Sequence, residues 1–154
     1  MIEKLQHHTI EISNQIHSVF QLSYAVEAKL LDAIDFPPLK RPLESYQNSD
    51  TIFYGYLEGT ELAGVIEINP TDKYIEIDSL VILPKFFRQG IAKKLLVFVF
   101  ERFETTLFIV ETGVNNKPAT QLYKKLGFKE TKQWDTDFGI RKVRFERRVK
   151  LQPK

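Results

Sequence analysis

Residues 80–96 read LVILPKFFRQGIAKKLL, and this stretch decides the fold class. It begins as a short apolar strand, breaks at Pro84, turns at Gly90 and continues as an apolar helix. A strand that passes through a glycine turn into a helix brings unpaired backbone N–H groups and the positive end of the helix dipole to one point. Such a point can hold a phosphate group, and Gly90 lets the anion come close to the main chain.

A second segment with recognisable spacing reads NKPATQLYKKLGF and spans residues 116–128. Asn116 suits a helix N-cap, with Pro118 in the first turn of that helix. Together the two segments resemble the signature motifs of the GNAT superfamily of N-acetyltransferases, which move an acetyl group from acetyl-CoA to an amine. The first motif, L-x-V-x-P followed by [QR]-x-x-G-x-[GA], is matched over residues 80–92, and the second, N-x-x-A-x-x-L-Y-x-x-x-G-F, over residues 116–128.

The sequence departs from the family pattern at the anion-binding turn. Phe87 stands where the family usually has Gln or Arg, and Arg88 follows where many members have Gly. Because the anion contacts of such a loop come mainly from main-chain N–H groups, we expect cofactor binding to survive this change. The resemblance covers residues 50–130 well and the N-terminal third of the chain poorly.

The resemblance implies acetyl-CoA as co-substrate, together with a set of residues that contact it. The main chain of residues 80–82 would pair with the pantetheine amides like an added strand. Arg88 would face the pyrophosphate or the 3′-phosphate, whereas Lys94 is equally well explained as a solvated helix position. The implied cofactor-binding residues are Leu80, Val81, Ile82, Arg88, Gln89, Gly90, Ala92, Lys93 and Asn116.

Two acidic residues on the strand before the turn are candidates for the base that accepts the amine proton. By resemblance, Glu76 lies where the histone-acetylating branch of the family carries its catalytic glutamate, and Asp78 is the reserve. In a regular strand, alternation would place both carboxyl groups on one face with Leu80 and Ile82. The alternative is that both are solvated charges on the polar face of the strand.

Tyr123 is the candidate acid, because by resemblance the tyrosine of the second motif is aimed at the CoA sulfur. A donor there helps the reaction, since a free thiolate is only a fair leaving group at neutral pH. The structural alternative is a core tyrosine that packs under Phe128. For Asn116, helix capping is sufficient as a role, and a cofactor contact is compatible with it.

Composition indicates an ordinary globular protein of 154 residues, 43% hydrophobic and 27% charged, which we expect to form one domain over residues 1–154. The net charge of +2 gives no argument for nucleic-acid or membrane partners. With no apolar run of about eighteen residues and no apolar leader after Met1, we expect neither a membrane span nor export. The absence of cysteine fits a cytoplasmic protein and excludes a cysteine nucleophile. The three histidines lack acidic neighbours at ligand spacing, so no metal is expected.

Periodicity predicts an α/β fold with a mixed central sheet flanked by helices, which is also the GNAT architecture. Residues 9–33 have helical periodicity and would form two helices, or one that bends near Ser23, and residues 36–50 would form a loop. These parts, about 9–50, would lie on the acceptor side, residues 51–130 would form the acetyl-CoA-binding core, and residues 129–150 the closing strands. The other predicted elements are a hairpin over 52–68, a strand over 74–83, a helix over 89–103, a strand over 107–111, a helix over 118–126, and strands over 129–134 and 140–149.

These observations favour an N-acetyltransferase in which a primary amine attacks acetyl-CoA directly in a ternary complex. The alternative is an acyl-CoA-binding sensor of the same fold without turnover. Nucleic-acid binding by the basic segment 141–150 is less favoured, since its apolar residues alternate with charges as in a half-buried edge strand. The acceptor, the acyl length and a homodimer through the closing strands stay open. Four acids in the acceptor-side region could attract a cationic amine, namely Glu27, Asp32, Asp35 and Glu44.

Overall fold

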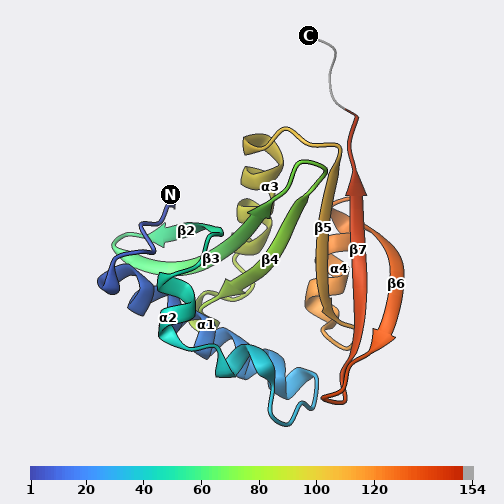
Figure 1. Cartoon of the computed structure of the whole chain (residues 1–154), viewed down its shortest axis with the longest axis horizontal. Coiled ribbons are helices and arrows are strands. Elements are labelled where there is room, and N and C mark those ends of the chain that lie inside the picture. The colour runs from blue at the N-terminus through green and yellow to red at the C-terminus, as the bar shows by residue number, and fades with distance from the viewer. Residues whose placement is uncertain (151–154) are drawn as a thin grey trace.

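A computed structural model describes residues 1–150 and contains one seven-stranded sheet with the order β1-β2-β3-β4-β5-β7-β6 (Figure 1). Neighbouring strands are antiparallel except β4 and β5, which are parallel. The predicted mixed sheet flanked by helices is therefore confirmed. The strands are β1 (Ile2–Lys4), β2 (Ile52–Glu58), β3 (Glu61–Pro70), β4 (Ile75–Ile82), β5 (Leu107–Gly113), β6 (Lys129–Asp135) and β7 (Arg141–Arg148).

In the part of the chain that the structure describes, four α-helices and two short 3-10 helices connect the strands. They are α1 (Ile10–Leu30), η1 (Pro37–Lys40), α2 (Leu43–Gln47), η2 (Pro84–Phe86), α3 (Ile91–Arg102) and α4 (Lys117–Lys125). The Thr9 side chain caps α1, which runs without a break because its sequence contains no Gly or Pro. Instead of bending α1, Ser23 accepts a hydrogen bond from the Ile82 amide at 3.3 Å. Within the described residues, no helix is long and apolar enough to cross a membrane.

The prediction of a continuous loop over residues 36–50 is wrong, because η1 and α2 lie in this segment. Pro37 begins η1 and Pro42 precedes α2 directly. Proline lacks an N–H group that the first turn of a helix would leave unpaired anyway, so these prolines begin helical turns as well as ending them.

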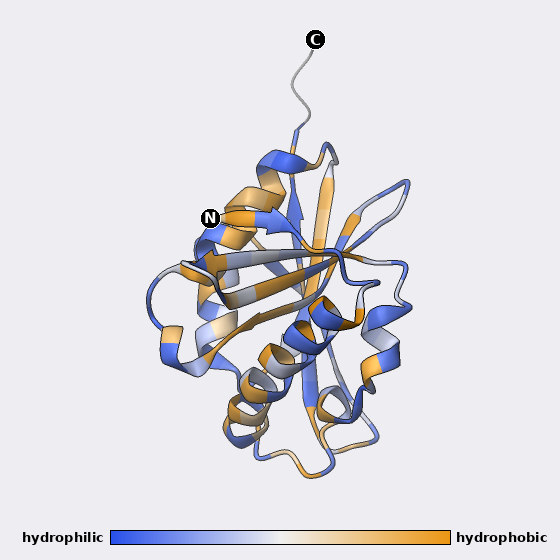
Figure 2. Cartoon of the chain, turned by 90° about the vertical axis from the view of Figure 1, so that its left-hand side faces the viewer, coloured by the Kyte–Doolittle hydropathy of each residue, from blue (hydrophilic) through white to orange (hydrophobic). Residues whose placement is uncertain are grey.

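The helices cover both faces of the sheet (Figure 1). On one face, α3 and α4 pack in a core that includes Leu95, Leu96 and Tyr123. On the other, α1 and α2 pack in a second core that includes Phe20 and Tyr46. Figure 2 shows the corresponding pattern, with hydrophobic stretches along the strands and helices that alternate between hydrophobic and hydrophilic residues.

The feature that positions the site is a bulge in β4. Ile68 pairs with Ile77 and Glu67 with Ser79, so Asp78 is an extra residue with no partner on β3. The side-chain alternation therefore slips by one. Ile77, like Leu80 further along the strand, lies on the face covered by α3. The prediction that Glu76 and Asp78 share a face with Leu80 and Ile82 is wrong for this reason.

Beyond the bulge, β4 and β5 separate. Their parallel pairing is limited to three positions and ends at Ile77 opposite Val110. Figure 1 shows the two strands close together at one end and diverging toward the other. We call this opening the wedge, bounded by β4 residues 78–82 and β5 residues 111–113.

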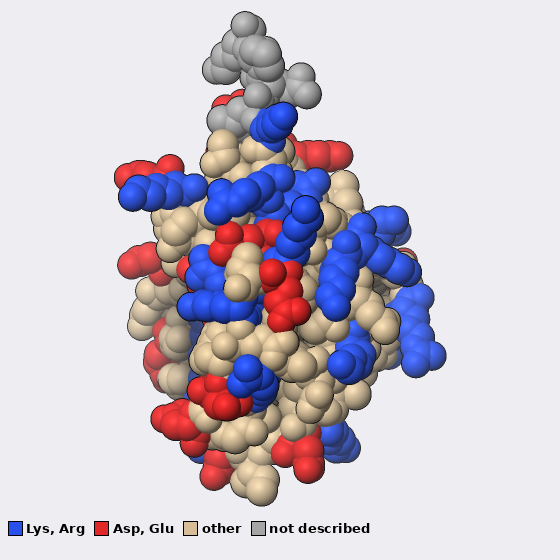
Figure 3. All heavy atoms as spheres, turned by 90° about the vertical axis from the view of Figure 1, so that its right-hand side faces the viewer, with Lys and Arg blue, Asp and Glu red and all other residues tan. Residues whose placement is uncertain are grey.

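At the far end of the sheet, β7 lies between β5 and β6, so the prediction of an edge strand over 141–150 is wrong. The edge strand is β6, whose residues are almost all exposed. The basic residues of β7 lie among acidic partners, as in the pair Arg144–Glu146 with 3.1 Å between Nε and Oε2. Figure 3 shows this side of the molecule, where Lys and Arg are interspersed with Asp and Glu.

Candidate active site

A pocket of about 1010 Å³ occupies the wedge. Its lining comes from both faces of the sheet, with Tyr123 of α4 and Ile91 of α3 on one side and Tyr24 of α1 on the other. The turn between β6 and β7 contributes Phe138. The pocket therefore continues through the sheet at the point where β4 and β5 part.

At one end of the pocket lies the N-terminus of α3. Gly90 occupies the N-cap position with a φ of 78°, and no side chain caps the helix. The first amides of α3 are consequently available to a ligand, next to the positive end of the helix dipole. Arg88 also has a positive φ, 64°, which is uncommon for a residue with a Cβ. Both residues line the pocket.

Main-chain groups of β4 face the wedge. The Ile82 amide points away from β3, since it donates to Ser23. Main-chain groups alternate in direction along a strand, so those of Leu80 point the same way and those of Val81 point toward β3. The backbone N–H and C=O groups of Leu80 therefore face the wedge, where an extended ligand could pair with them.

Most of the predicted cofactor residues come together at this pocket, and two do not. The Val81 side chain is buried in the α1 core, and Gln89 is exposed outside the pocket lining. The predicted residues that line the pocket are Leu80, Ile82, Arg88, Gly90, Ala92, Lys93 and Asn116.

Tyr123 lines the pocket and is also part of the core. Its side chain is 5% exposed, and its ring packs on Phe128 at 5.5 Å and Phe145 at 5.8 Å between centroids. The packing role and the pocket position therefore coexist. Burial raises the pKa of the Tyr123 phenol, and the nearby Glu27 carboxyl raises it further. The hydroxyl stays protonated at neutral pH.

Asn116 caps α4 and also orients an acid from α1. Its side-chain oxygen accepts from the Ala119 amide at 3.3 Å, while its Nδ2 donates to Glu27 Oε1 at 2.6 Å. Thr112 donates to the same oxygen at 3.4 Å. Burial raises the pKa of Glu27, although these hydrogen bonds lower it in part. The sequence indicated Glu27 only as one of several acids, because nothing in its local pattern marks a contact with residues so far along the chain.

Asp78 is the carboxyl group at the apex of the wedge. Its side chain is exposed, but it opens into the concave pocket, where protein replaces part of the surrounding water. Burial therefore raises the pKa of Asp78 to about 7, with further contributions from the negative charges of Glu76 and Glu67. Glu76 does not line the pocket. Glu111, the first β5 residue past the apex, does line it and lies 3.9 Å from Lys142.

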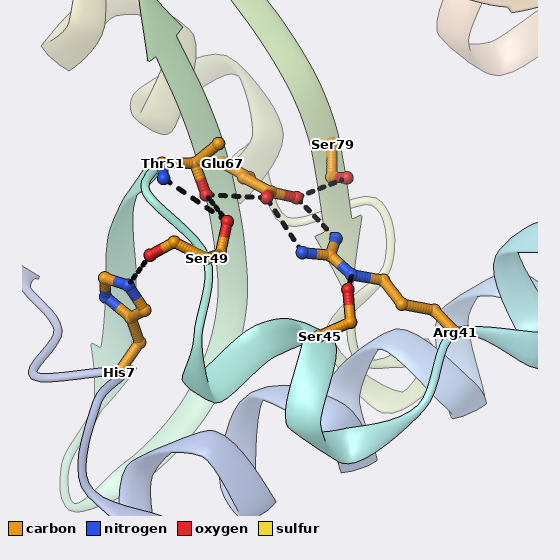
Figure 4. Close-up of polar contacts among 7 residues, drawn as sticks. All are labelled: His7, Arg41, Ser45, Ser49, Thr51, Glu67 and Ser79. Carbon is orange, nitrogen blue, oxygen red and sulfur yellow. Dashed lines mark hydrogen bonds and ion pairs between the residues drawn. The ribbon is translucent and has the colours of Figure 1, made fainter.

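A buried polar network fixes the bulge from the side opposite the wedge (Figure 4). Glu67 is 2% exposed, and its carboxylate accepts hydrogen bonds from the two terminal guanidinium nitrogens of Arg41 at 2.8 and 3.0 Å. The same carboxylate accepts from Ser79 at 3.0 Å and from Thr51 at 2.7 Å. Arg41 donates to Ser45 in turn, so the network ties the segment of η1 and α2 to the residue that follows Asp78. Among residues 1–150, no three histidine or acidic side chains gather as ligands for a metal ion.

Comparison with known proteins agrees with this geometry. A family model described as Acetyltransferase (GNAT) family matches residues 15–128. The UPF0157 protein YqkA of Bacillus subtilis (strain 168) is 36% identical over 131 residues, which cover 84% of this chain but only 38% of that protein. This chain thus spans well under half the length of that curated relative.

Two solved structures illustrate the shared fold. The ribosomal-protein-S18-alanine N-acetyltransferase of Escherichia coli has a TM-score of 0.78 and 15% identity, covering 100% of this chain and 96% of its own. The PaiA N-acetyltransferase of Thermoplasma acidophilum, in complex with coenzyme A, has a TM-score of 0.70 and 20% identity, with 97% and 99% covered. Since the family model spans most of the sequence and both signature segments, the chain belongs to the GNAT family of acetyltransferases.

Proposed function

We propose that this protein transfers an acetyl group from acetyl-CoA to a primary amine by direct attack in a ternary complex. The observation that carries the proposal is the pocket through the wedge. At one end it offers an uncapped helix N-terminus for phosphate groups, and at the apex it offers a carboxyl group and a phenol. These groups suit phosphate binding, removal of a proton from the amine and stabilisation of the departing thiolate.

In the proposed complex, Arg88 and the first amides of α3 bind the phosphates, and the main chain of Leu80 pairs with the pantetheine arm. This pairing would bring the thioester to the apex, near Asp78 and Tyr123. The amine enters from the face that carries α1 and the β6–β7 turn. The two substrates would then meet within the sheet.

The bond changes follow from this arrangement. The amine nitrogen forms a bond to the acetyl carbon, and the carbon–sulfur bond breaks with its electron pair left on sulfur. Of the two acids predicted on β4, Asp78 lines the pocket, so we assign it as the group that accepts the amine proton. A pKa of about 7 suits this task at neutral pH. Glu76 would act through its charge, which helps to keep the pKa of Asp78 high.

The raised pKa of Tyr123 narrows its proposed role from general acid to hydrogen-bond donor. A phenol that holds its proton more tightly than a thiol, whose pKa is about 8.5, favours a hydrogen bond to the departing sulfur over complete proton transfer. We therefore propose that Tyr123 stabilises the CoA thiolate by donating a hydrogen bond. Solvent then protonates the thiolate after release.

The test combines binding and turnover. Calorimetric titration should show binding of acetyl-CoA and CoA with a Kd in the micromolar range of about 1–100 μM, and no binding of ATP. Release of free thiol in the presence of a panel of amines should then reveal acetyl transfer. Binding without turnover on any amine would instead support the sensor function. Absence of CoA binding would contradict both.

A further inference from the structure

We propose that the acceptor is a singly charged primary amine carried on an aromatic or bulky aliphatic body. This inference rests on the proposed acetyl transfer and concerns the half of the pocket away from α3. Three separate segments line that half, namely the end of α1 with the chain that follows it, η1, and the turn between β6 and β7. We call the surface that they form the acceptor surface; its apolar members include Tyr24, Leu31, Phe36, Phe138 and Ile140.

The acceptor surface is held in place by its own packing. Leu31, Phe36 and Ile140 form a small core of their own, separate from the two cores that flank the sheet. The Tyr24 and Phe36 rings meet edge to face with 5.9 Å between centroids. The next residues of η1 are Pro37 and Pro38, which restrict the backbone at this point. An apolar group entering here meets a surface that is already formed.

The charges around this surface favour one positive charge on the acceptor. Three carboxyl groups line the pocket. Glu27 is engaged by Asn116 and Thr112. Glu111 lies within 3.9 Å of Lys142 and 4.0 Å of Arg144. Within residues 1–150, Asp78 has neither an ion-pair partner nor the side-chain hydrogen bonds that engage Glu27, so it is the carboxyl group free to receive an ammonium group.

A second positive charge on the acceptor would meet an unfavourable environment. It would lie near the like charge of Lys142, which also lines the pocket. Removing a charged group from water without a partner is costly. Asp32 and Asp35 do not compensate, since neither lines the pocket and Asp35 pairs with Lys40 at 3.6 Å. Glu44, the last of the acids predicted on this side, also lies outside the lining.

The experiment compares kcat/KM for amines of different chemistry at saturating acetyl-CoA. The apolar monoamines 2-phenylethylamine and hexylamine should exceed ethanolamine, spermidine and kanamycin by about tenfold or more. A higher kcat/KM for spermidine, kanamycin or an alanine-starting peptide would overturn the proposed acceptor class and leave acetyl transfer intact. Binding of acetyl-CoA without acetylation of any amine would contradict the proposed function itself, and the acceptor class with it.

A matched pair of variants locates the effect. Phe138→Ser should raise KM for 2-phenylethylamine about tenfold without changing the Kd for acetyl-CoA, because Phe138 lies on the acceptor surface. Trp134→Ser is the control, since Trp134 is a partly buried aromatic residue of the same hairpin that does not line the pocket. Equal effects of the two variants on KM would contradict the placement of the acceptor.

Discussion

The hydroxyl group of Tyr123 is the most direct test of the mechanism at the scale of single residues. Tyr123→Phe keeps the ring that packs on Phe128 and Phe145 and removes only the hydroxyl of this pocket-lining residue. Turnover should fall by about ten- to a thousandfold, while the Kd for CoA stays nearly constant. Tyr74→Phe, which removes a hydroxyl outside the pocket, should leave both unchanged. Weakened CoA binding with normal turnover of the bound complex would exclude the proposed role.

The raised pKa of Asp78 predicts that activity rises with pH and that the contribution of Asp78 to the stability of the fold falls with pH. In the pH profile of kcat/KM, activity should rise through an apparent pKa of about 7 as the carboxylate forms. Asp78→Asn should lower activity and remove this inflection. An unchanged profile in Asp78→Asn would assign the proton transfer to another group, and Glu111→Gln would then be the next variant to measure.

The same shift makes Asp78 a destabilising group above acidic pH. Between the ordinary pKa of an aspartate, about 3.9, and about 7, the folded state binds a proton that the unfolded state has lost. The contribution of Asp78 to stability therefore falls as pH rises through this window. Asp78→Asn should unfold at a higher temperature than the wild type at pH 8, and the difference should shrink toward pH 4. The charges that set this balance are Glu76, Glu67, Glu111 and Arg41.

Substitutions at two glycines with similar backbone conformations distinguish an effect on stability from an effect on CoA binding. Gly90 has a φ of 78° and Gly59 a φ of 62°, and in both cases an added Cβ would meet no atom within 4 Å. Replacement by valine should therefore cost each site about 1–2 kcal/mol of stability through the left-handed backbone alone. Only Gly90→Val should also weaken CoA binding, because only Gly90 lies at the start of α3 in the pocket. Equal CoA affinities in the two variants would argue against the anion-binding turn.

At the scale of elements, the bulge of β4 depends on the Glu67 network. Glu67→Gln leaves Arg41 partly buried without its carboxylate, which should cost about 3–5 kcal/mol in urea-induced unfolding. The exposed pair Lys85–Glu61 is the control, since its two side chains are 61% and 45% exposed, and Glu61→Gln should cost about 0–1 kcal/mol. Similar losses for the two variants would mean that the network contributes no more than a surface pair.

Sequence reasoning was successful where one segment determines its own structure. The hairpin of β2 and β3, the turn into α3 and the Asn116 cap are local, and the structure has all three. The bulge at Asp78 was not predictable from β4 alone, because the residue that follows it, Ser79, is held by Glu67 on β3, and Glu67 in turn pairs with Arg41. The position of β7 inside the sheet was missed for a similar reason, since alternation along a strand does not reveal how many neighbours it has.

The residues of the candidate site also fall into two groups, those that a local motif predicts and those that only the tertiary packing brings together. Gly90 and Tyr123 lie in motifs and were predicted to contact ligand, and both line the pocket. The proposed acceptor surface joins three distant segments, whose residues Leu31, Phe36 and Ile140 belong to one buried cluster. Periodicity within one segment does not show which distant segment packs against it. Nothing in the sequence therefore marked Phe138 as a pocket residue.

For the whole molecule, a cofactor bound in the wedge as proposed would join two parts of the sheet. β4 and β5 share only three paired positions, all on one side of the apex, so β1–β4 and β5–β7 are connected weakly beyond it. Acetyl-CoA at about 100 times its Kd should add about 2.7 kcal/mol to the free energy of unfolding. In hydrogen exchange, the amides of β4 residues 79–82 and β5 residues 111–113 should gain protection together with the first turn of α3. ATP should produce no protection at either strand. Protection confined to α3 would show that the cofactor binds at the helix alone and leaves the wedge open.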